Sequence, residues 1–478
     1  MSAPAHALRN DEPSSYAETR APRVASIDSA RAFVRATLLE APREGVLAIT
    51  VPAPVTPVEA PLRALRKGTT WVFAPSEGVS VAAIGVAREA RASGEARFVE
   101  ARAACEAMLG QVVHRVDAGA LAIPVRAFVG FAFAAGTACA APWESFGDAR
   151  VTLPRWTYAS DGARASLTLA IDVGRGMDER LALAELEAVY GAIETARRQP
   201  SDAATIVRAD HLDAARWARS IEAIRSAIER GDARKIVAAR RSVITTASDI
   251  EPLDVLTRLG ETRGPTTRFM ARVGSATFLG ATPEHLFVQR GTRIATEALA
   301  GSIAADAERG GERLVASAKD REEHAYVVRH IVERLAPLCA RVAHPDAPQV
   351  RRLSTVMHLR TPIEAELARP THPIDVIAAL HPTPAVGGTP VEHAVPWIVQ
   401  HETERGWYGA PFGWIDARGD AEFVVALRCG VIQGARAWLW AGGGIVEGSD
   451  PQAEWDETAL KMRPMLRALG CRENGAVR

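Results

Sequence analysis

The chain has 478 residues, of which 47% are apolar and 24% are charged, a composition typical of a globular protein with a large core. Its 57 basic and 57 acidic residues balance, so no excess charge favours binding to nucleic acid or to an acidic membrane. No run of about 18 apolar residues predicts a membrane span, and the five scattered cysteines are typical of a reducing cytosol, so we expect a cytoplasmic protein.

The first part of the chain carries strand and helix signals but no cluster of catalytic residue types. Residues 1–23 are polar and are expected to form a disordered tail. Over residues 24–205, short apolar runs alternate with helical segments, with a hairpin predicted between residues 69 and 84. The stretch 89–110 is rich in Ala, Arg and Glu and predicts one helix. We interpret this part as a scaffold.

The second part, residues 206–478, begins at a boundary expected within residues 199–209. It opens with a helical segment, followed by an apolar strand over residues 235–241. An Ala-Gly-Ser turn is predicted at residues 300–302, and a long helix over residues 319–340. Helices and hairpins alternate in both parts, which predicts an α+β fold with antiparallel strands.

Residues 421–466 hold the densest group of chemically active residue types. Two apolar runs, residues 423–427 and 438–440, predict a hairpin. The first run ends in Arg428, which can bind a carboxylate through two parallel hydrogen bonds. The second ends in three glycines, residues 442–444, which allow a ligand to approach the backbone and offer N–H groups to an anion. This stretch therefore favours a site for a small carboxylated ligand.

A helix is predicted directly after these glycines, with Asp450 as its cap. The spacing of Glu454, Glu457 and Lys461 places all three on one helix face. Neighbouring carboxylates repel unless a cation compensates, and Mg²⁺ typically binds one or two carboxylates together with substrate oxygens. Glu323, on a separate predicted helix, is a candidate partner. A Mg²⁺ site is one interpretation, and a solvated helix face is the other.

Nine motifs of the second part carry a family resemblance. In chain order they are KIVAARR, TPEHL, ALAGS, KDREEH, LHPTPAVGGTP, RGWYGAPFGW, VVALRCG, AGGGIV and EWDETALKM. In this order, over about residues 209–466, the sequence resembles the chorismate-binding enzymes, which include anthranilate, aminodeoxychorismate, isochorismate and salicylate synthases. The resemblance implies two αβ halves with packed antiparallel sheets and outer helices, similar to anthranilate synthase component I.

Within this family, the sequence is most similar to the isochorismate synthases of menaquinone and siderophore biosynthesis. The discriminating residue is Lys235, where amine-transferring members carry Gln and water-using members carry Lys. The resemblance implies that Lys235 is the general base for addition of water at C2 of chorismate, a role that requires a neutral amine. It implies that Glu284 is the general acid for the leaving C4 hydroxyl, which requires a raised pKa.

The same resemblance implies the other site residues. Glu323 and Glu457 match the Mg²⁺ ligands, and Glu454 matches an acid that holds metal-bound water. The substrate-binding residues are Arg428, Lys461, Gly443 and Gly444 for the enolpyruvyl carboxylate, His381 beside the C4 hydroxyl, Tyr408 near a substrate carboxylate and Gly301 at the ring pocket. His324 and His358 are expected to be structural.

The function expected from the sequence is Mg²⁺-dependent conversion of chorismate to isochorismate. We expect a monomer without a glutaminase subunit, nucleic-acid partner or membrane anchor. Salicylate synthase is the nearest alternative, and no residue separates the two. Lys235 disfavours anthranilate or aminodeoxychorismate synthesis, and the intact set of charged site residues disfavours a catalytically inactive chorismate-binding regulator.

Overall fold

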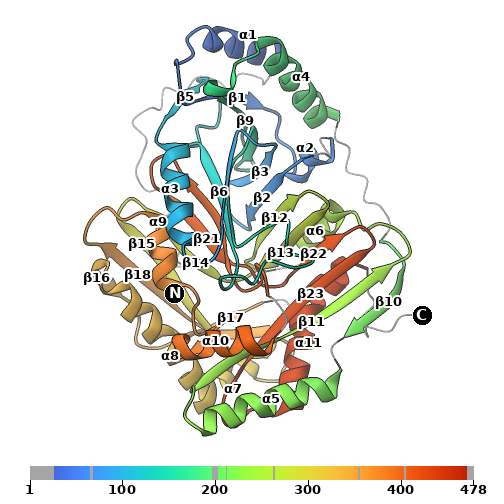
Figure 1. Ribbon diagram of the computed structural model, residues 1–478, viewed down its shortest axis with the longest axis vertical. Coiled ribbons are helices and arrows are strands. Elements are labelled where there is room, and N and C mark those ends of the chain that lie inside the picture. Colours follow the sequence, from blue (N-terminus) through green and yellow to red (C-terminus); the bar gives the residue numbers. More distant parts are fainter. Residues whose placement is uncertain are drawn as a thin grey trace.

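The computed structural model describes residues 26–64, 68–195, 203–211, 213–261, 264–353, 356–402 and 405–470. The expected tail lies outside these described residues, as does part of the expected boundary segment. Two large β-sheets with helices on their outer faces make up the described chain (Figure 1). Among the described helices, none has the length and apolar content that a membrane crossing requires.

The first sheet contains 13 strands within the described residues. Their spatial order is β10 (Ile206–His211), β11 (Lys235–Thr246), β23 (Arg436–Ile445), β22 (Cys429–Gln433), β13 (Ala276–Thr282), β12 (Thr267–Val273), β2 (Thr70–Pro75), β3 (Ser80–Ile84), β8 (Trp156–Ser160), β9 (Ala165–Asp172), β1 (Val46–Ala53) and β5 (Val112–Val116), with β19 (Gly388–Thr389) beside β11. The hairpin predicted from residues 69–84 is confirmed as β2–β3, and β12 and β13 form a second hairpin.

The second sheet contains 10 strands of the described chain. Their order is β16 (Cys339–Ala343), β18 (Val356–Leu367), β15 (Arg293–Ala304), β14 (His285–Arg290), β21 (Ala421–Val425), β20 (Pro411–Asp416), β6 (Arg126–Phe131), β7 (Ala149–Leu153) and β4 (Arg88–Ala92), with β17 (Gln349–Arg352) beside β18. In the described residues β1 and β5 pair in parallel, and the other strand pairs are antiparallel. The predicted α+β class is confirmed.

Both sheets run across the boundary expected near residue 205. In the first sheet β2 pairs with β12, and in the second β6 pairs with β20. The sequence analysis placed a sheet in each half, whereas each sheet takes strands from both parts of the chain. The reason is edge pairing: an unpaired strand edge exposes backbone donors and acceptors, and these two pairings cover it. The division into parts 24–205 and 206–478 stays a prediction.

The helices cover the outer faces of the two sheets (Figure 1). Helices that contact the first sheet or one another beside it are α1 (Ile27–Leu38), α2 (Glu59–Ala64), α4 (Glu179–Thr195), α5 (Ala214–Glu229), α6 (Pro252–Gly260), α10 (Val391–His401) and α11 (Pro451–Ala468), while a 3-10 turn spans Val173–Arg175. Those on the second sheet are α3 (Arg97–Leu109), α7 (Gly310–Ala316), α8 (Ala318–Leu335) and α9 (Pro373–Leu380). Each helix pairs an apolar face with its sheet.

An aromatic layer fills the space between the sheets. Trp71 of β2 packs against Phe128 of β6 and Phe412 of β20, with ring centroids 5.8 and 5.3 Å apart. Trp407 lies against the same rings. Burying rings of this size is strongly favourable, and their tilted contacts add specificity to how one sheet sits on the other. This layer fixes the relative position of the strands that carry the site.

Two predicted elements are wrong. Residues 89–110 do not form one helix: Arg88–Ala92 is strand β4, which pairs with β7 at the sheet edge, and helix α3 starts at Arg97. The pairing overrides the local helix propensity. The hairpin expected from residues 423–427 and 438–440 is also absent, because β21 lies in the second sheet and β23 in the first. The partner of β23 in the real hairpin is β22.

The predicted turn at residues 300–302 is a bulge inside β15. This strand continues to Ala304 and pairs with β18 along its length, with a register shift between Ala300 and Ser302. Gly301 has φ = +71°, a conformation that glycine adopts without strain and that extra residues in β-bulges often require. The bulge turns this part of β15 toward helix α8, since a Cβ at Gly301 would lie 3.1 Å from Asp320.

Candidate active site

A cavity of about 230 Å³ lies where the two sheets meet α8 and α11. Its walls come from β11 and β23 of the first sheet and from β15 and β18 of the second. The predicted site residues that line it are Glu284, Gly301, Glu323, Tyr408, Arg428, Gly444, Glu454, Glu457 and Lys461. Residues far apart in the sequence therefore contribute to one enclosed space.

Lys235 is the first residue of β11 and is 1% exposed. Its Nζ donates a hydrogen bond of 2.7 Å to Oε1 of Glu323, which lines the cavity from α8. Strand β11 pairs with β23, so Val237 lies opposite Gly444. Among the described residues, Lys235 is not part of the cavity lining; its amine lies beside Gly444 and Glu323, which are, and the ion pair joins it to a carboxylate of a different element.

Polar groups lie close to all three positions of the triple-glycine segment, where a side chain would collide with them. A Cβ at Gly442 would lie 3.1 Å from the hydroxyl of Tyr408, and one at Gly443 would lie 2.7 Å from Oε2 of Glu454. A Cβ at Gly444 would lie 2.4 Å from Cε of Lys235 and 2.8 Å from Oε1 of Glu323. The segment lacks side chains because these polar groups occupy that space.

We expect the substitution Gly444→Ala to lower turnover on the order of 100-fold, because the new methyl group displaces the Lys235–Glu323 pair. Gly448→Ala is the matched control, since no atom lies within 4 Å of its added Cβ. Steady-state kinetics and the melting temperature of both variants measure the effect. Unchanged turnover in folded Gly444→Ala protein would contradict the positioning of this pair.

Arg428 lies where the chain crosses from β21 of the second sheet to β22 of the first. Its φ of +51° is unusual for a residue with a side chain, and such strain often accompanies functional sites. Burial lowers the pKa of its guanidinium to about 10, so the group stays charged at neutral pH. Among the described residues, Nη1 of Arg428 is buried without a hydrogen-bond partner. An anionic ligand in the cavity would accept the hydrogen bond that this nitrogen offers.

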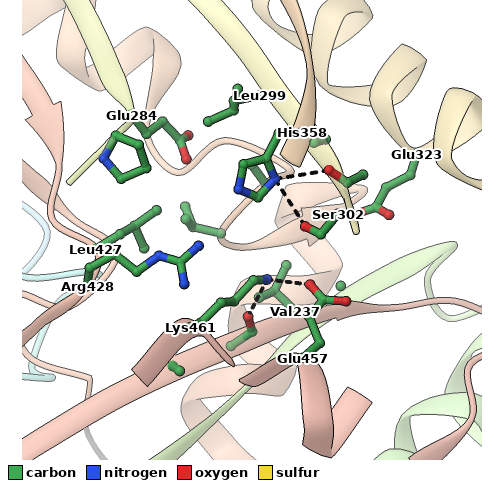
Figure 2. Close-up of a pocket in the computed structure, with 18 of the residues that line it drawn as sticks. Val237, Glu284, Leu299, Ser302, Glu323, His358, Leu427, Arg428, Glu457 and Lys461 are labelled. Atoms are coloured by element: carbon green, nitrogen blue, oxygen red, sulfur yellow. Dashed lines mark hydrogen bonds and ion pairs between the residues drawn. The ribbon is translucent and has the colours of Figure 1, made fainter. Parts of the chain in front are cut away.

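Lys461 provides a second cation from helix α11. Its Nζ lies 2.6 Å from Oε1 of Glu457 and donates a 2.9 Å hydrogen bond to the carbonyl of Gly442. The predicted helix cap is confirmed, since the Asp450 side chain accepts from the Ala453 amide. Figure 2 shows Glu284 and Arg428 on one side of the cavity, Glu323 on the other and His358 between them. The cavity therefore presents positive groups among several carboxylates.

Glu284 is a buried carboxyl at the cavity wall, just before β14. Burial, followed by repulsion from Glu297, raises its pKa to about 8. Lys235, Lys461 and Arg428 act in the opposite direction but do not outweigh burial. At neutral pH the group consequently carries its proton, which is the state that a general acid requires.

The three carboxylates expected to serve Mg²⁺ lie at this cavity but have other partners. Glu323 and Glu457 are each paired with a lysine, and Glu454 accepts a 2.8 Å hydrogen bond from Ser449. Burial and then repulsion by Glu457 raise the pKa of Glu454 to about 7. Within the described chain no cluster of three His, Cys, Asp or Glu side chains is close enough to hold a metal. Two carboxylates plus substrate oxygens nevertheless fit the chemistry of Mg²⁺.

Two predicted substrate-binding residues do not line the cavity. Nε2 of His381 donates a 3.0 Å hydrogen bond to the carbonyl of Phe133, and its ring packs edge-on against the Phe133 ring. The place of His381 beside the substrate stays a prediction. Gly443 lies next to Glu454, which lines the cavity. Tyr408 and Gly301 do line the cavity, and burial raises the pKa of Tyr408.

His358 was expected to have a structural role. His358 lines the cavity from β18, and its Nδ1 lies 3.0 Å from the carbonyl of Gly301 and 3.1 Å from Oγ of Ser302. Burial lowers its pKa to about 3, so the imidazole is neutral. Because Nδ1 donates to a carbonyl, Nε2 is left as an acceptor. The signal available in the sequence was a histidine between two apolar residues, Met357 and Leu359.

The chain belongs to the family of chorismate-binding enzymes, because the sequence model described as "Chorismate binding enzyme" matches residues 35–470. It is 39% identical over 337 residues to the salicylate biosynthesis isochorismate synthase of Pseudomonas aeruginosa, covering 68% of this chain and 70% of that protein. It is 36% identical over 349 residues to isochorismate synthase MenF of Bacillus subtilis, covering 72% of this chain and 74% of that one.

A solved structure supports the fold. The menaquinone-specific isochorismate synthase MenF of Escherichia coli has a TM-score of 0.75 and 24% sequence identity, covering 92% of this chain and 99% of that chain. Anthranilate synthase component I of Streptococcus pneumoniae has a TM-score of 0.65 at 18% identity, covering 82% and 92%. The predicted similarity to the fold of anthranilate synthase component I is therefore confirmed.

Proposed function

We propose that this protein is an isochorismate synthase that adds water at C2 of chorismate while the C4 hydroxyl leaves. The observation that carries this proposal is the cavity, whose lining holds a protonated buried acid, Glu284, and the carboxylate of Glu323, to which the amine of Lys235 is hydrogen-bonded. Relatives that share 39% and 36% of their aligned residues with this chain are named isochorismate synthases. The substrate carries two carboxylates, and the cavity offers the cations Arg428 and Lys461.

Each proposed role follows from the position of a side chain. Arg428 binds a carboxylate through its unpartnered Nη1. Glu284 gives its proton to the departing C4 oxygen, and Lys235 takes a proton from the attacking water. Nζ of Lys235 lies 2.7 Å from Oε1 of Glu323, and the proposed base role requires an amine with a free lone pair that faces the attacking water.

Mg²⁺ is part of this proposal as the cofactor. Glu323 and Glu457 would hold it, and Glu454, which also lines the cavity, accepts a hydrogen bond from Ser449. When bound, the ion supplies positive charge to a substrate carboxylate and to the developing negative charge during hydroxyl loss. Glu323 and Glu457 both line the cavity, and each is paired with a lysine, Lys235 and Lys461. Carboxylates that already pair with one cation support a site where Mg²⁺ could replace it.

We place the enzyme in the cytoplasm as a monomer that acts without a glutaminase subunit. The described cysteines, Cys105, Cys139, Cys339 and Cys429, are free, which supports a reducing compartment. Lys235 supports water rather than ammonia as the nucleophile, since the resemblance associates glutamine at this position with amine transfer. The relatives named for salicylate and menaquinone pathways leave the consuming pathway open.

The product formed from chorismate tests the function directly. We expect purified protein with chorismate and Mg²⁺ to yield isochorismate on liquid chromatography, and a chelator to stop the reaction until Mg²⁺ is restored. An equimolar yield of salicylate and pyruvate would instead identify a salicylate synthase. Turnover that requires ammonia would identify an aminating enzyme. Chorismate binding without turnover would identify an inactive regulator.

A further inference from the structure

Glu297 is a buried carboxylate that none of the roles above uses. It lies on β15 and is 6% exposed. Its Oε1 accepts a hydrogen bond from Nη1 of Arg351, and its Oε2 accepts one from Nε of Arg360, each 2.5 Å long. These two arginines come from β17 and β18. Such a clamp holds a carboxylate as an anion in a fixed place.

The strand geometry places this clamp against the cavity. Side chains two residues apart share one face of a strand. On β15, Glu297 shares its face with Leu299, which lines the cavity; on β18, Arg360 shares its face with His358, which also lines it. In Figure 2, Leu299 lies beside Glu284 at this wall. The clamped carboxylate is therefore the next position along the wall that carries Glu284.

We propose that Glu297 is a positioning residue for the general acid: its fixed negative charge keeps the proton on Glu284, and Arg351 and Arg360 hold that charge in place. This inference rests on the proposed function, in which Glu284 must deliver a proton. It identifies a part of the acid's environment that does not touch the substrate. Changing the charge of Glu297 or of either arginine partner then moves the pH above which the enzyme loses activity.

The other charged groups around Glu284 are consistent with this role. Burial and then the Glu297 charge raise the pKa of Glu284. From other elements, Lys235 of β11, Lys461 of α11 and Arg428 lower it. Glu297 thus opposes three cations that the substrate and metal chemistry require. Without it, these cations would favour the ionised form of the acid.

The ionisation of Glu297 itself is secured by its partners. Burial alone would raise the pKa of Glu297, but the charges of Arg351, His285 and Arg360 and the hydrogen bond from Arg360 outweigh burial, and the net direction is downward. Glu297 therefore stays ionised at neutral pH, whereas Glu284 stays protonated. Where the pKa values of two buried carboxyls are shifted in opposite directions, one typically serves as the proton donor and the other as a fixed negative charge.

The test compares two substitutions that change the clamp charge in opposite directions. Glu297→Gln removes a negative charge, so we expect the alkaline limb of the kcat/KM profile to move down by about one pH unit. Arg351→Gln removes a positive charge, so we expect that limb to move up. A purely structural role would lower activity at every pH without moving the limb, and coincident limbs in all three proteins would overturn the proposal.

A measurement without turnover separates this proposal from the proposed function. The difference in melting temperature between each protein and its Glu284→Gln derivative, followed from about pH 6 to about pH 9, reports the proton on Glu284. We expect that difference to level off at lower pH in the Glu297→Gln background. If the melting-temperature difference levels off at lower pH in this background while no isochorismate forms, the proposed function is wrong and the proposed role of Glu297 stands. If the difference levels off at the same pH with and without the Glu297→Gln substitution, the proposed role of Glu297 is wrong.

Discussion

Replacing Glu284 with glutamine is expected to lower turnover by about 10²- to 10⁴-fold, the range that a lost general acid typically costs. Glutamine has nearly the same shape but cannot deliver a proton to the departing hydroxyl. Because the pKa of Glu284 is about 8, the wild-type kcat/KM should also decline as the pH rises through that value. Initial rates between about pH 6 and about pH 9 measure both effects.

The same substitution should stabilise the protein at alkaline pH. The folded-state pKa of Glu284 is raised to about 8, above an unfolded value of about 4.3. Folding is therefore favoured by this group at low pH, and that contribution is lost as the pH rises toward 8. Glutamine removes the penalty of a buried charge, so Glu284→Gln should melt at a higher temperature than wild type near pH 9.

A buried carboxyl away from the cavity provides the control for Glu284. Glu422 of β21 is 7% exposed and faces Arg290 instead of the cavity. We expect Glu422→Gln to keep wild-type turnover and the wild-type alkaline limb. Equal losses in Glu284→Gln and Glu422→Gln would show that the effect comes from lost packing, and the acid role would then be rejected.

Replacing Lys235 with alanine is expected to abolish addition of water, with a loss of turnover of about 10²-fold or more. The amine is the basic group opposite the acid in the proposed mechanism, and its removal takes away the group that accepts the proton of the water. Chorismate binding should persist, because Arg428 and Lys461 remain to bind its carboxylates. Calorimetric titration with chorismate in Mg²⁺, beside a turnover assay, separates the two properties.

The neighbouring Arg234 is the matched control for this substitution. It precedes Lys235 in the chain and is exposed to solvent, so Arg234→Ala removes a positive charge without touching the cavity. We expect normal turnover in that variant. Near-native turnover of Lys235→Ala would disprove the base assignment, and lost binding in Lys235→Ala would move its role from proton transfer to substrate binding.

The sequence predicted the charged members of the site better than the elements that carry them. Glu284, Arg428 and Lys461 reach one cavity as the motif order implied. Their motifs are short, and each depends on local backbone chemistry such as the Asp450 cap. Local hairpins such as β2–β3 were also predictable, because their strands are neighbours in the chain.

Long-range pairing could not be predicted from local patterns. Residues 423–427 and 438–440 have the periodicity of hairpin strands, yet the left-handed backbone at Arg428 directs them into different sheets. Residues 89–110 favour a helix locally, but pairing with β7, which is distant in sequence, makes Arg88–Ala92 the edge strand β4. The ring of His381 is fixed by the carbonyl of Phe133, which is also distant in sequence. These outcomes depend on tertiary partners.

The strand pairings β2–β12 and β6–β20, which join the two parts of the chain, have a consequence for engineering. The motifs of catalysis all lie after residue 205, which invites the transplantation of that segment as an independent module. A fragment cut there would present two bare strand edges and half of an aromatic layer to water, features that promote self-association. The part of the chain before residue 205 carries no catalytic groups, but it supplies strands to both sheets. Its removal would take away strands that hold the cavity walls in position.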